Sequence, residues 1–151
     1  MKYLPITDYE TFHSLMEPYY RDGADAETPQ EELDSFIRYL YSLVQDGTIS
    51  GCVAYDREPV GICLWWIDTA DLPFSNKPGW GTILEMGLTP DNRGKGRGRE
   101  LAEYALTRMD VSDFYVCAYG PAEGFWVKCG YEDRGEIASN GLKLLVQRKK
   151  I

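Results

Sequence analysis

The feature that most constrains the fold is a basic, glycine-rich segment between a strand-like run and a helix-like run. Residues 83–88 are mainly apolar, residues 93–98 alternate charged residues with glycine, and an amphipathic pattern follows from Leu101. Glycine lets backbone N–H groups approach an anion closely, and a helix N-terminus adds partial positive charge. This order predicts an α/β chain in which a strand, a loop and a helix together bind a phosphate group.

The charge of this loop is opposite to that of the whole chain. Arg93, Lys95, Arg97 and Arg99 are closely spaced cations, whereas the 151 residues carry 16 Lys and Arg against 24 Asp and Glu, a formal net charge of −8. Diffuse attraction to nucleic acid or to an anionic membrane is therefore not expected. The loop favours a compact phosphate-bearing ligand. A nucleic-acid-binding protein that uses the same cations is the less favoured alternative.

Two common nucleotide-binding motifs do not fit the loop. A Walker A loop needs Ser or Thr after Gly-Lys, but Gly96 follows Lys95. The dinucleotide-binding pattern needs a third glycine at the position held by Arg99. Both of these large classes are therefore disfavoured.

The rest of the sequence predicts a mixed sheet with helices on both faces. Capping-box patterns at residues 7–10 and 28–31 each precede a helical apolar stripe, and Pro18 is expected to kink or end the first helix near Glu17. Asn140-Gly141 predicts the turn of a closing hairpin. The expected later strands are 50–55, 60–69, 82–89, 114–119, 131–137 and 142–147, and the expected later helices are 101–109 and 122–129. We therefore expect one α/β (α+β) domain over residues 1–151, in three layers, with a mostly antiparallel sheet of six to seven strands.

Cellular context follows from composition. No apolar run is long enough to span a bilayer, and Asp8 and Glu10 stand where a secretory apolar region would lie, so a cytoplasmic protein is expected. The four cysteines show no C-x-x-C spacing, which predicts buried free thiols and no metal site.

The glycine-rich loop and a later segment resemble two motifs of one known family. Residues 93–98, Arg-Gly-Lys-Gly-Arg-Gly, fit the pattern Arg/Gln-x-x-Gly-x-Gly/Ala, and residues 122–131 resemble A-x-x-F-Y-x-K-x-G-F/Y. Together with the strand at 86–90, they resemble the Gcn5-related N-acetyltransferase (GNAT) superfamily over residues 83–131. The resemblance implies a GNAT-like fold in which acetyl-CoA lies between splayed strands that end at Leu88 and near Tyr119.

The resemblance also implies a reaction and a set of cofactor-binding residues. A primary amine, on a small molecule or on a peptide or protein lysine or N-terminus, would attack the acetyl thioester directly, and a backbone N–H near Leu88 would stabilise the oxyanion. The diphosphate would rest on the amides of the glycine-rich loop. The implied cofactor-binding residues are Met86, Gly87, Leu88, Arg93, Gly94, Lys95, Gly96, Arg97, Gly98, Arg99, Ala122 and Trp126.

The sequence offers one candidate for the catalytic base and one for the catalytic acid. Glu85, the one carboxylate within its strand, is the candidate base that takes the amine proton; its alternative is an exposed strand carboxylate. The family often has a tyrosine acid where this chain has Trp126, whose indole is not a practical proton source. Tyr119 is the substitute candidate, and water is the alternative.

The acceptor site is expected near the connection between the first two helices. Tyr19, Tyr20 and Asp25 belong to an aromatic and acidic stretch that would attract a cationic amine, although a solvated loop accounts for the same residues. Trp80, at the end of a loop, is a further candidate. A non-catalytic CoA-binding sensor with the same fold, and a homodimer, are left open. His13, the single histidine, lies in a helical apolar context and is not expected to be catalytic.

Overall fold

The computed structural model of the protein describes residues 1–23, 25–72 and 74–148. The chain forms two compact units. Unit 1 comprises Met1–Leu64 and Glu85–Leu101, and unit 2 comprises Trp65–Leu84 and Ala102–Ile151. None of the described helices has the length and apolar character needed to cross a bilayer.

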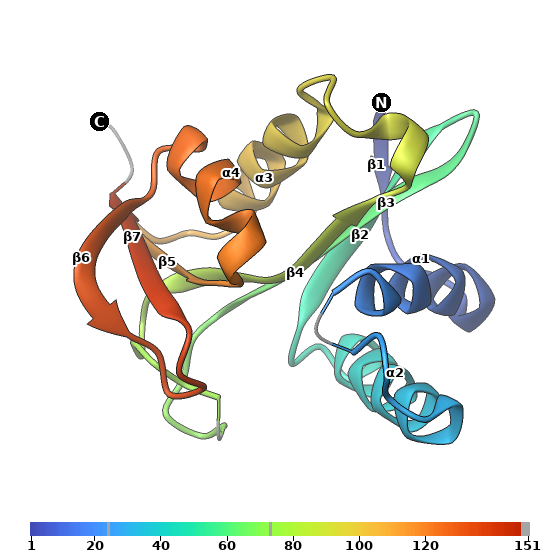
Figure 1. The fold of residues 1–151 in the computed structure, drawn as a ribbon, viewed down its shortest axis with the longest axis horizontal. Helices are drawn as coiled ribbons and strands as arrows, with labels where there is room; N and C mark the ends of the chain where they lie inside the picture. The colour runs from blue at the N-terminus through green and yellow to red at the C-terminus, as the bar shows by residue number, and fades with distance from the viewer. Residues whose placement is uncertain (24, 73, 149–151) are drawn as a thin grey trace. The chain divides into compact units, whose positions relative to one another are not determined.

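The described residues form seven strands and four α-helices (Figure 1). The strands are β1 (Lys2–Leu4), β2 (Ser50–Asp56), β3 (Glu58–Ile67), β4 (Gly81–Leu88), β5 (Asp113–Ala118), β6 (Glu132–Ile137) and β7 (Lys143–Arg148). The α-helices are α1 (Tyr9–Arg21), α2 (Gln30–Gln45), α3 (Arg97–Thr107) and α4 (Glu123–Lys128), with short 3₁₀ turns at Pro90–Asn92 and Gly120–Ala122. The strand order is β1-β2-β3-β4-β5-β7-β6, with β4 parallel to β5 and β5 antiparallel to β7. This mixed sheet confirms the predicted fold class.

In unit 1, α1 and α2 lie side by side (Figure 1). Each is amphipathic, and the apolar face of α1 buries Phe12 and Met16 while that of α2 buries Leu33 and Ile37. Asp8 caps α1 by accepting a hydrogen bond from the Thr11 N–H at 2.8 Å. The two sequence-predicted helices are therefore confirmed.

Pro18 does not end the first helix, one of the two effects expected of it. Helix α1 continues through this residue to Arg21, although proline removes one intrahelical hydrogen bond. The last turn is held from both sides: Tyr20 is buried, and the Arg21 guanidinium donates to the backbone oxygens of Asp25 and Thr28 at 3.1 and 2.6 Å. Tertiary contacts thus outweigh the local helix-breaking tendency.

Two further details of unit 1 differ from expectation. Strand β1 pairs antiparallel with β2, from Lys2 opposite Tyr55 to Leu4 opposite Val53, and three residues give too little alternation to be recognised in sequence. The turn between β2 and β3 is also tighter than expected. Only Arg57 separates the two strands, with a φ of 70°.

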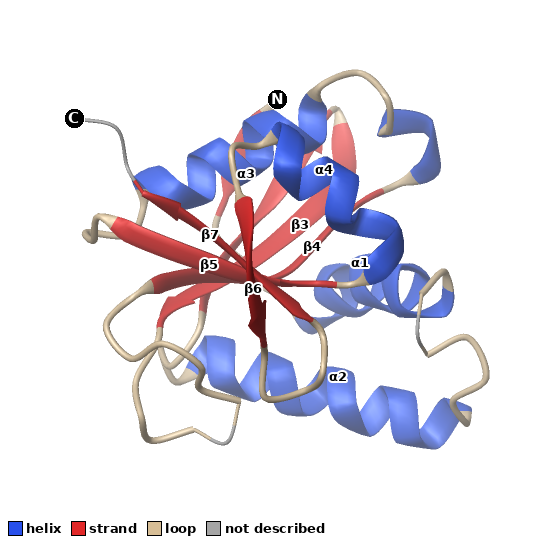
Figure 2. Cartoon of the chain, turned by 60° about the vertical axis from the view of Figure 1, so that its left-hand side comes forward, coloured by secondary structure: helices blue, strands red, loops and turns tan. Residues whose placement is uncertain are grey.

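In unit 2, β5 pairs with β7, and the β6–β7 hairpin continues the sheet (Figure 2). Its core includes Phe114, Tyr115 and Leu145, all almost fully buried. The Asn140-Gly141 turn is confirmed: Gly141 has a φ of 85°, and the Ala138 N–H donates to the Leu142 oxygen at 2.8 Å.

A buried carboxylate organises the connection between β3 and β4 within unit 2. Asp68 is 1% exposed, and its Oδ2 accepts hydrogen bonds from the N–H groups of Asn76 and Lys77 at 2.8 and 2.7 Å and from the Tyr115 hydroxyl at 2.7 Å. Burial raises the pKa of this carboxyl, but the Ser75 hydroxyl and these donors outweigh burial and hold the pKa below its ordinary value. Asp68 therefore fixes the loop as a charged acceptor.

Candidate active site

The glycine-rich loop leaves β4 through a short, hydrogen-bonded turn. The Thr89 N–H donates to the Val60 oxygen at 2.8 Å, and the Asn92 side chain donates to the Thr89 hydroxyl at 2.8 Å. Gly94 and Gly96 then adopt φ values of 75° and 80°, a region that disfavours residues with a Cβ. A Cβ built on either glycine meets no atom within 4 Å. The loop is thus left-handed at both glycines and open above them.

Arg93 and Arg97 of the loop are engaged with protein acceptors. The Arg93 Nε donates to the Leu88 oxygen at 3.0 Å, and its Nη2 lies 3.3 Å from the Asp22 carboxylate. The Arg97 guanidinium donates to the Asn92 side chain and pairs with Asp56 at 2.8 Å. These arginines hold the loop in shape, a role that the sequence analysis did not predict because their partners are distant in sequence.

Several donors of the loop remain available. Among the described residues, no protein acceptor takes a hydrogen bond from the backbone N–H groups of Gly94, Lys95 or Gly96, and the Lys95 ammonium forms no ion pair. The first intrahelical bond of α3 runs from the Glu100 N–H to the Gly96 oxygen at 3.2 Å. Free N–H groups at a helix start, next to an unpaired cation, suit an anionic group.

Glu85 lies on β4 in unit 1 and has a strongly perturbed pKa. Part of the residue remains accessible, yet burial of its carboxyl group raises the pKa to about 7, against the lowering effect of the Tyr19 and Tyr20 phenols; the Asp25 carboxylate adds to the rise. A carboxyl that titrates near neutral pH can accept a proton at physiological pH and release it again.

Helix α1 supplies the aromatic side chains next to this carboxyl. A Cβ built on Gly87 would lie 2.8 Å from the Tyr19 ring, so the ring packs directly on β4 two residues from Glu85. The Tyr20 ring packs edge-on against Tyr19 and Phe36, at centroid distances of 5.1 and 5.5 Å. The structure therefore brings Tyr19 and Tyr20 together with Glu85.

Asp25 belongs to the same group, but it is also part of the connection between α1 and α2. Its Oδ1 accepts a hydrogen bond from the Thr28 hydroxyl at 3.0 Å, and its backbone oxygen is held by Arg21 at 3.1 Å. Its negative charge reaches Glu85 and raises the pKa there. Asp25 thus contributes charge to the site and shape to the loop.

The other predicted site residues lie in unit 2. Tyr119 is 44% exposed at the end of β5, and its backbone oxygen accepts from the Ala122 N–H at 2.8 Å. The Trp126 ring is buried edge-on against Tyr131 at 5.6 Å. Trp80 packs against a cluster that includes Tyr115, with the Lys77 ammonium 4.7 Å from its ring. Their assignment to the site stays a prediction.

The pairing between β4 and β5 is short within unit 2. The register joins Gly81 to Phe114 and Thr82 to Tyr115 and, in the described part of that unit, goes no further. Strand β5 itself runs on to Ala118. The parallel ladder thus ends well before the strand does.

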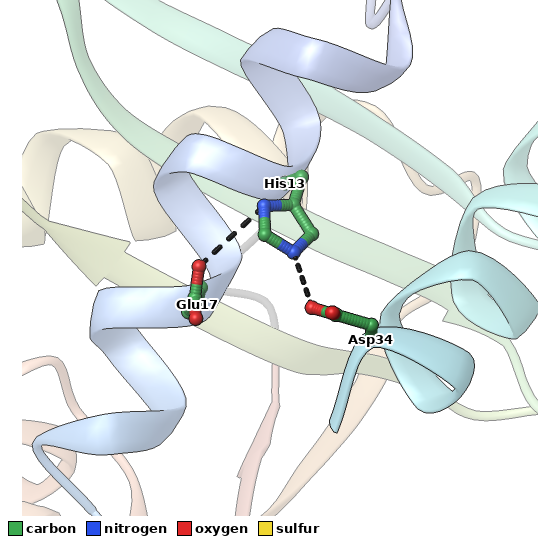
Figure 3. Close-up of side chains that lie close together, drawn as sticks. All are labelled: His13, Glu17 and Asp34. Carbon is green, nitrogen blue, oxygen red and sulfur yellow. Dashed lines mark hydrogen bonds and ion pairs between the residues drawn. The ribbon is translucent and has the colours of Figure 1, made fainter. Parts of the chain in front are cut away.

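One group of side chains among the described residues could hold a metal ion. Ligand atoms of His13, Glu17 and Asp34 lie within 4.8 Å of one another (Figure 3). The His13 Nε2 is 2.7 Å from Asp34 and its Nδ1 is 3.6 Å from Glu17, while the Gln30 amide donates to both carboxylates at 2.7 and 2.9 Å. The described arrangement is a hydrogen-bonded link between α1 and α2.

Comparison with known proteins places this geometry in a family. Residues 9–131 match the Acetyltransferase (GNAT) family, and the chain belongs to that family. A comparison with curated proteins found no match.

Solved structures show the same fold. A GCN5-related N-acetyltransferase from Ralstonia eutropha is 22% identical, with 91% of this chain and 95% of that chain covered and a TM-score of 0.71. The PaiA N-acetyltransferase of Thermoplasma acidophilum, crystallised with coenzyme A, is 14% identical, with 97% and 98% covered and a TM-score of 0.69. A GNAT family acetyltransferase from Brucella melitensis, in complex with acetyl-CoA, is 13% identical, with 99% and 88% covered and a TM-score of 0.68.

Proposed function

We propose that the chain is a single-domain N-acetyltransferase that moves an acetyl group from acetyl-CoA to a primary amine. The observation that carries the proposal is the pairing, within unit 1, of an open glycine-rich loop with a buried carboxyl that titrates near neutral pH. Membership of the acetyltransferase family supports it, and the family match runs through both units.

The loop fits the diphosphate of coenzyme A. The positive φ values of Gly94 and Gly96 expose the backbone N–H groups, and nothing occupies the space where a Cβ would stand. Lys95 supplies a charge that no protein carboxylate neutralises among the described residues. Arg93 and Arg97 act through the shape that they impose on the loop, because their guanidinium groups are already engaged.

Glu85 acts as the general base. Bound acetyl-CoA supplies an acetyl group activated as a thioester. Near neutral pH a carboxylate with a pKa of about 7 accepts the proton that the amine nitrogen loses as it is acylated. The Asp25 charge and the Tyr19 ring attract an amine that arrives as a cation, and the neutral amine in equilibrium with it is the nucleophile. The departing thiol is acidic enough to leave without an acid, because an ordinary thiol has a pKa near ~8.5; Tyr119 is the candidate acid.

The first test is turnover. Release of free thiol from acetyl-CoA is followed with propylamine, phenethylamine, 1,4-diaminobutane and a lysine-containing peptide, and the acetylated product is identified by mass spectrometry. We expect thiol release that depends on an amine. Binding of coenzyme A without release from any amine would instead indicate the sensor, which the replacement of the family tyrosine by Trp126 favours.

The second test is the loop. We expect Gly96→Glu to weaken coenzyme A binding at least about 100-fold in calorimetry, because a carboxylate then repels the diphosphate and an L side chain at positive φ costs about 1–2 kcal/mol. Gly47→Glu is the matched control: Gly47 has a φ of 83° and open space but lies after α2, away from the loop. Wild-type affinity in the Gly96 variant would remove the loop as the diphosphate site.

A further inference from the structure

A buried hydroxyl group beside Glu85 has no partner in the protein. Tyr20 is 7% exposed, and its Oη forms no hydrogen bond with any of the described residues. A buried hydroxyl without a hydrogen bond destabilises a fold. The Tyr20 hydroxyl therefore points to a ligand that forms the missing hydrogen bond. Burial, and then the nearby Glu85 charge, raise the pKa of the Tyr20 phenol, which keeps the hydroxyl neutral.

The position of this hydroxyl is fixed by packing. The Tyr20 ring is held between Tyr19 and Phe36, and Tyr19 is itself seated on Gly87. The Tyr20 Oη has no partner within ordinary hydrogen-bond geometry, but the Glu85 carboxyl is close enough for a side-chain hydrogen bond with this phenol to act on the pKa of both groups. Two neighbouring oxygen atoms, a phenol and a carboxylate, can each accept a hydrogen bond from one nitrogen placed beside them.

We infer that the Tyr20 hydroxyl and the Glu85 carboxylate together hold the nitrogen of the acceptor, one N–H on each, and that this pair selects primary over secondary amines. The inference rests on the proposed function. A primary amine has two N–H groups, which satisfy both oxygens while the lone pair remains free to attack. A secondary amine has one N–H, which leaves one buried oxygen without a partner.

The transfer step balances with these groups. The nitrogen lone pair forms the N–C bond to the acetyl carbon, the C–S bond breaks, and the sulfur leaves with the electron pair as a thiolate that takes a proton from water. The N–H held by Glu85 passes its proton to that carboxylate. The N–H held by Tyr20 stays on the product amide nitrogen, so Tyr20 is a positioning residue rather than a proton acceptor.

The test compares Tyr20→Phe with wild type on two amine pairs. The probes are propylamine and phenethylamine, each against its N-methyl derivative, and the measured quantity is the ratio of kcat/KM for primary over secondary amine. We expect wild type to prefer the primary amine about tenfold or more, because a site built for two hydrogen bonds rejects an analogue that lacks one. In Tyr20→Phe the ratio falls towards 1, mainly through loss of primary-amine turnover.

The matched control is Tyr41→Phe. Tyr41 packs edge-on against Tyr9 and Phe12 at 5.3 Å, so this variant removes a hydroxyl from the same helix pair without touching Glu85, and the ratio should not change. An active wild-type enzyme whose ratio persists in Tyr20→Phe overturns the inference alone. A wild-type enzyme inactive with every amine overturns the proposed function, and the inference with it.

A pH profile gives a second readout that a structural role would not move. The groups that act on Glu85 are the phenols of Tyr19 and Tyr20 from α1 and the Asp25 carboxylate from the following connection; the Cys63 thiol of β3 acts on Tyr19. Because the Tyr20 phenol lowers the Glu85 pKa, Tyr20→Phe should shift the acid limb of kcat/KM to higher pH. An unshifted limb together with an unchanged ratio would leave Tyr20 a packing residue.

Discussion

Asp68, which is buried, and Glu85, which is partly buried, have pKa values displaced in opposite directions. Asp68, in unit 2, accepts three hydrogen bonds on one oxygen, and its pKa lies below the ordinary value. For Glu85, in unit 1, burial outweighs the effect of the nearby phenols and raises the pKa to about 7. Burial disfavours the charge in both places, so the supply of donors decides the outcome.

This difference separates a structural carboxylate from a reactive one. At Asp68 two backbone N–H groups and a phenol donate hydrogen bonds to the charged carboxylate. These bonds stabilise the loop, and they also make the carboxylate a poor proton acceptor. Glu85 lacks backbone donors of this kind among the described residues, so its proton is available near neutral pH. A perturbed pKa alone therefore does not identify a catalytic group; its direction and its cause do.

The largest expected effect tests whether Glu85 is the reactive carboxylate. Glu85→Gln should lower kcat/KM about 100-fold or more at pH 8, because general-base catalysis contributes on that order. Protonation of the amine lowers kcat/KM of both proteins as the pH falls, and protonation of Glu85 below pH 7 should make the wild-type value fall about tenfold more per pH unit than that of the variant. Steady-state thiol release between pH 5.5 and 9 measures both. A variant that keeps the wild-type profile would show that Glu85 is not the base.

A smaller effect tests whether Asp68 is the structural carboxylate. Asp68→Asn should lower the free energy of unfolding by about 3 kcal/mol at pH 7, since the neutral amide oxygen holds the three donors more weakly than the charged carboxylate oxygen does. Because the folded pKa lies below the reference value of 3.8, the wild-type advantage is complete above pH 4 and is lost as the pH falls further. Urea denaturation measures it.

The matched control for Asp68→Asn is Tyr115→Phe, which removes one of the three donors and should cost only about 1 kcal/mol. Coenzyme A affinity should be unchanged in both variants, because the loop that is proposed to bind it lies in unit 1. Equal stability of Asp68→Asn and wild type would mean that the three hydrogen bonds do not hold the β3–β4 connection.

The two carboxylates also differ in how far the sequence predicts them. Glu85 is a lone charge in an apolar strand next to a recognisable loop, so the sequence predicts it as the candidate base. No sequence pattern indicates the role of Asp68, because its partners Asn76, Lys77 and Tyr115 come from a loop and a distant strand. Local motifs are encoded by neighbouring residues, whereas a hydrogen-bond network depends on the tertiary fold.

The same distinction applies inside the glycine-rich loop. The spacing of its glycines predicted the open turn, and the positive φ values of Gly94 and Gly96 agree with it. The roles of Arg93 and Arg97 could not be predicted, since their partners Asp22 and Asp56 lie 71 and 41 residues away. Likewise, the buried position of the Tyr20 hydroxyl follows from packing against Tyr19 and against Phe36 of α2, and no sequence pattern indicates it.

The smallest expected effect is on stability. It compares Glu85 with Asp68 directly, because it measures how far a reactive carboxylate lowers the free energy of unfolding. The folded pKa of Glu85, about 7, lies above the reference value of 4.5, so wild-type stability falls as the pH rises between these values and the charge is forced into the buried site. Glu85→Gln removes that charge and should stabilise the protein by about 2 kcal/mol at pH 8. One pKa unit corresponds to about 1.36 kcal/mol, and because Glu85 is partly exposed, the expected gain is smaller than the whole pKa difference would give. At pH 4.5 the two proteins should unfold at nearly the same urea concentration. A variant less stable than wild type at pH 8 would mean that Glu85, like Asp68, is ionised for structural reasons, and the contrast between the two carboxylates would be lost.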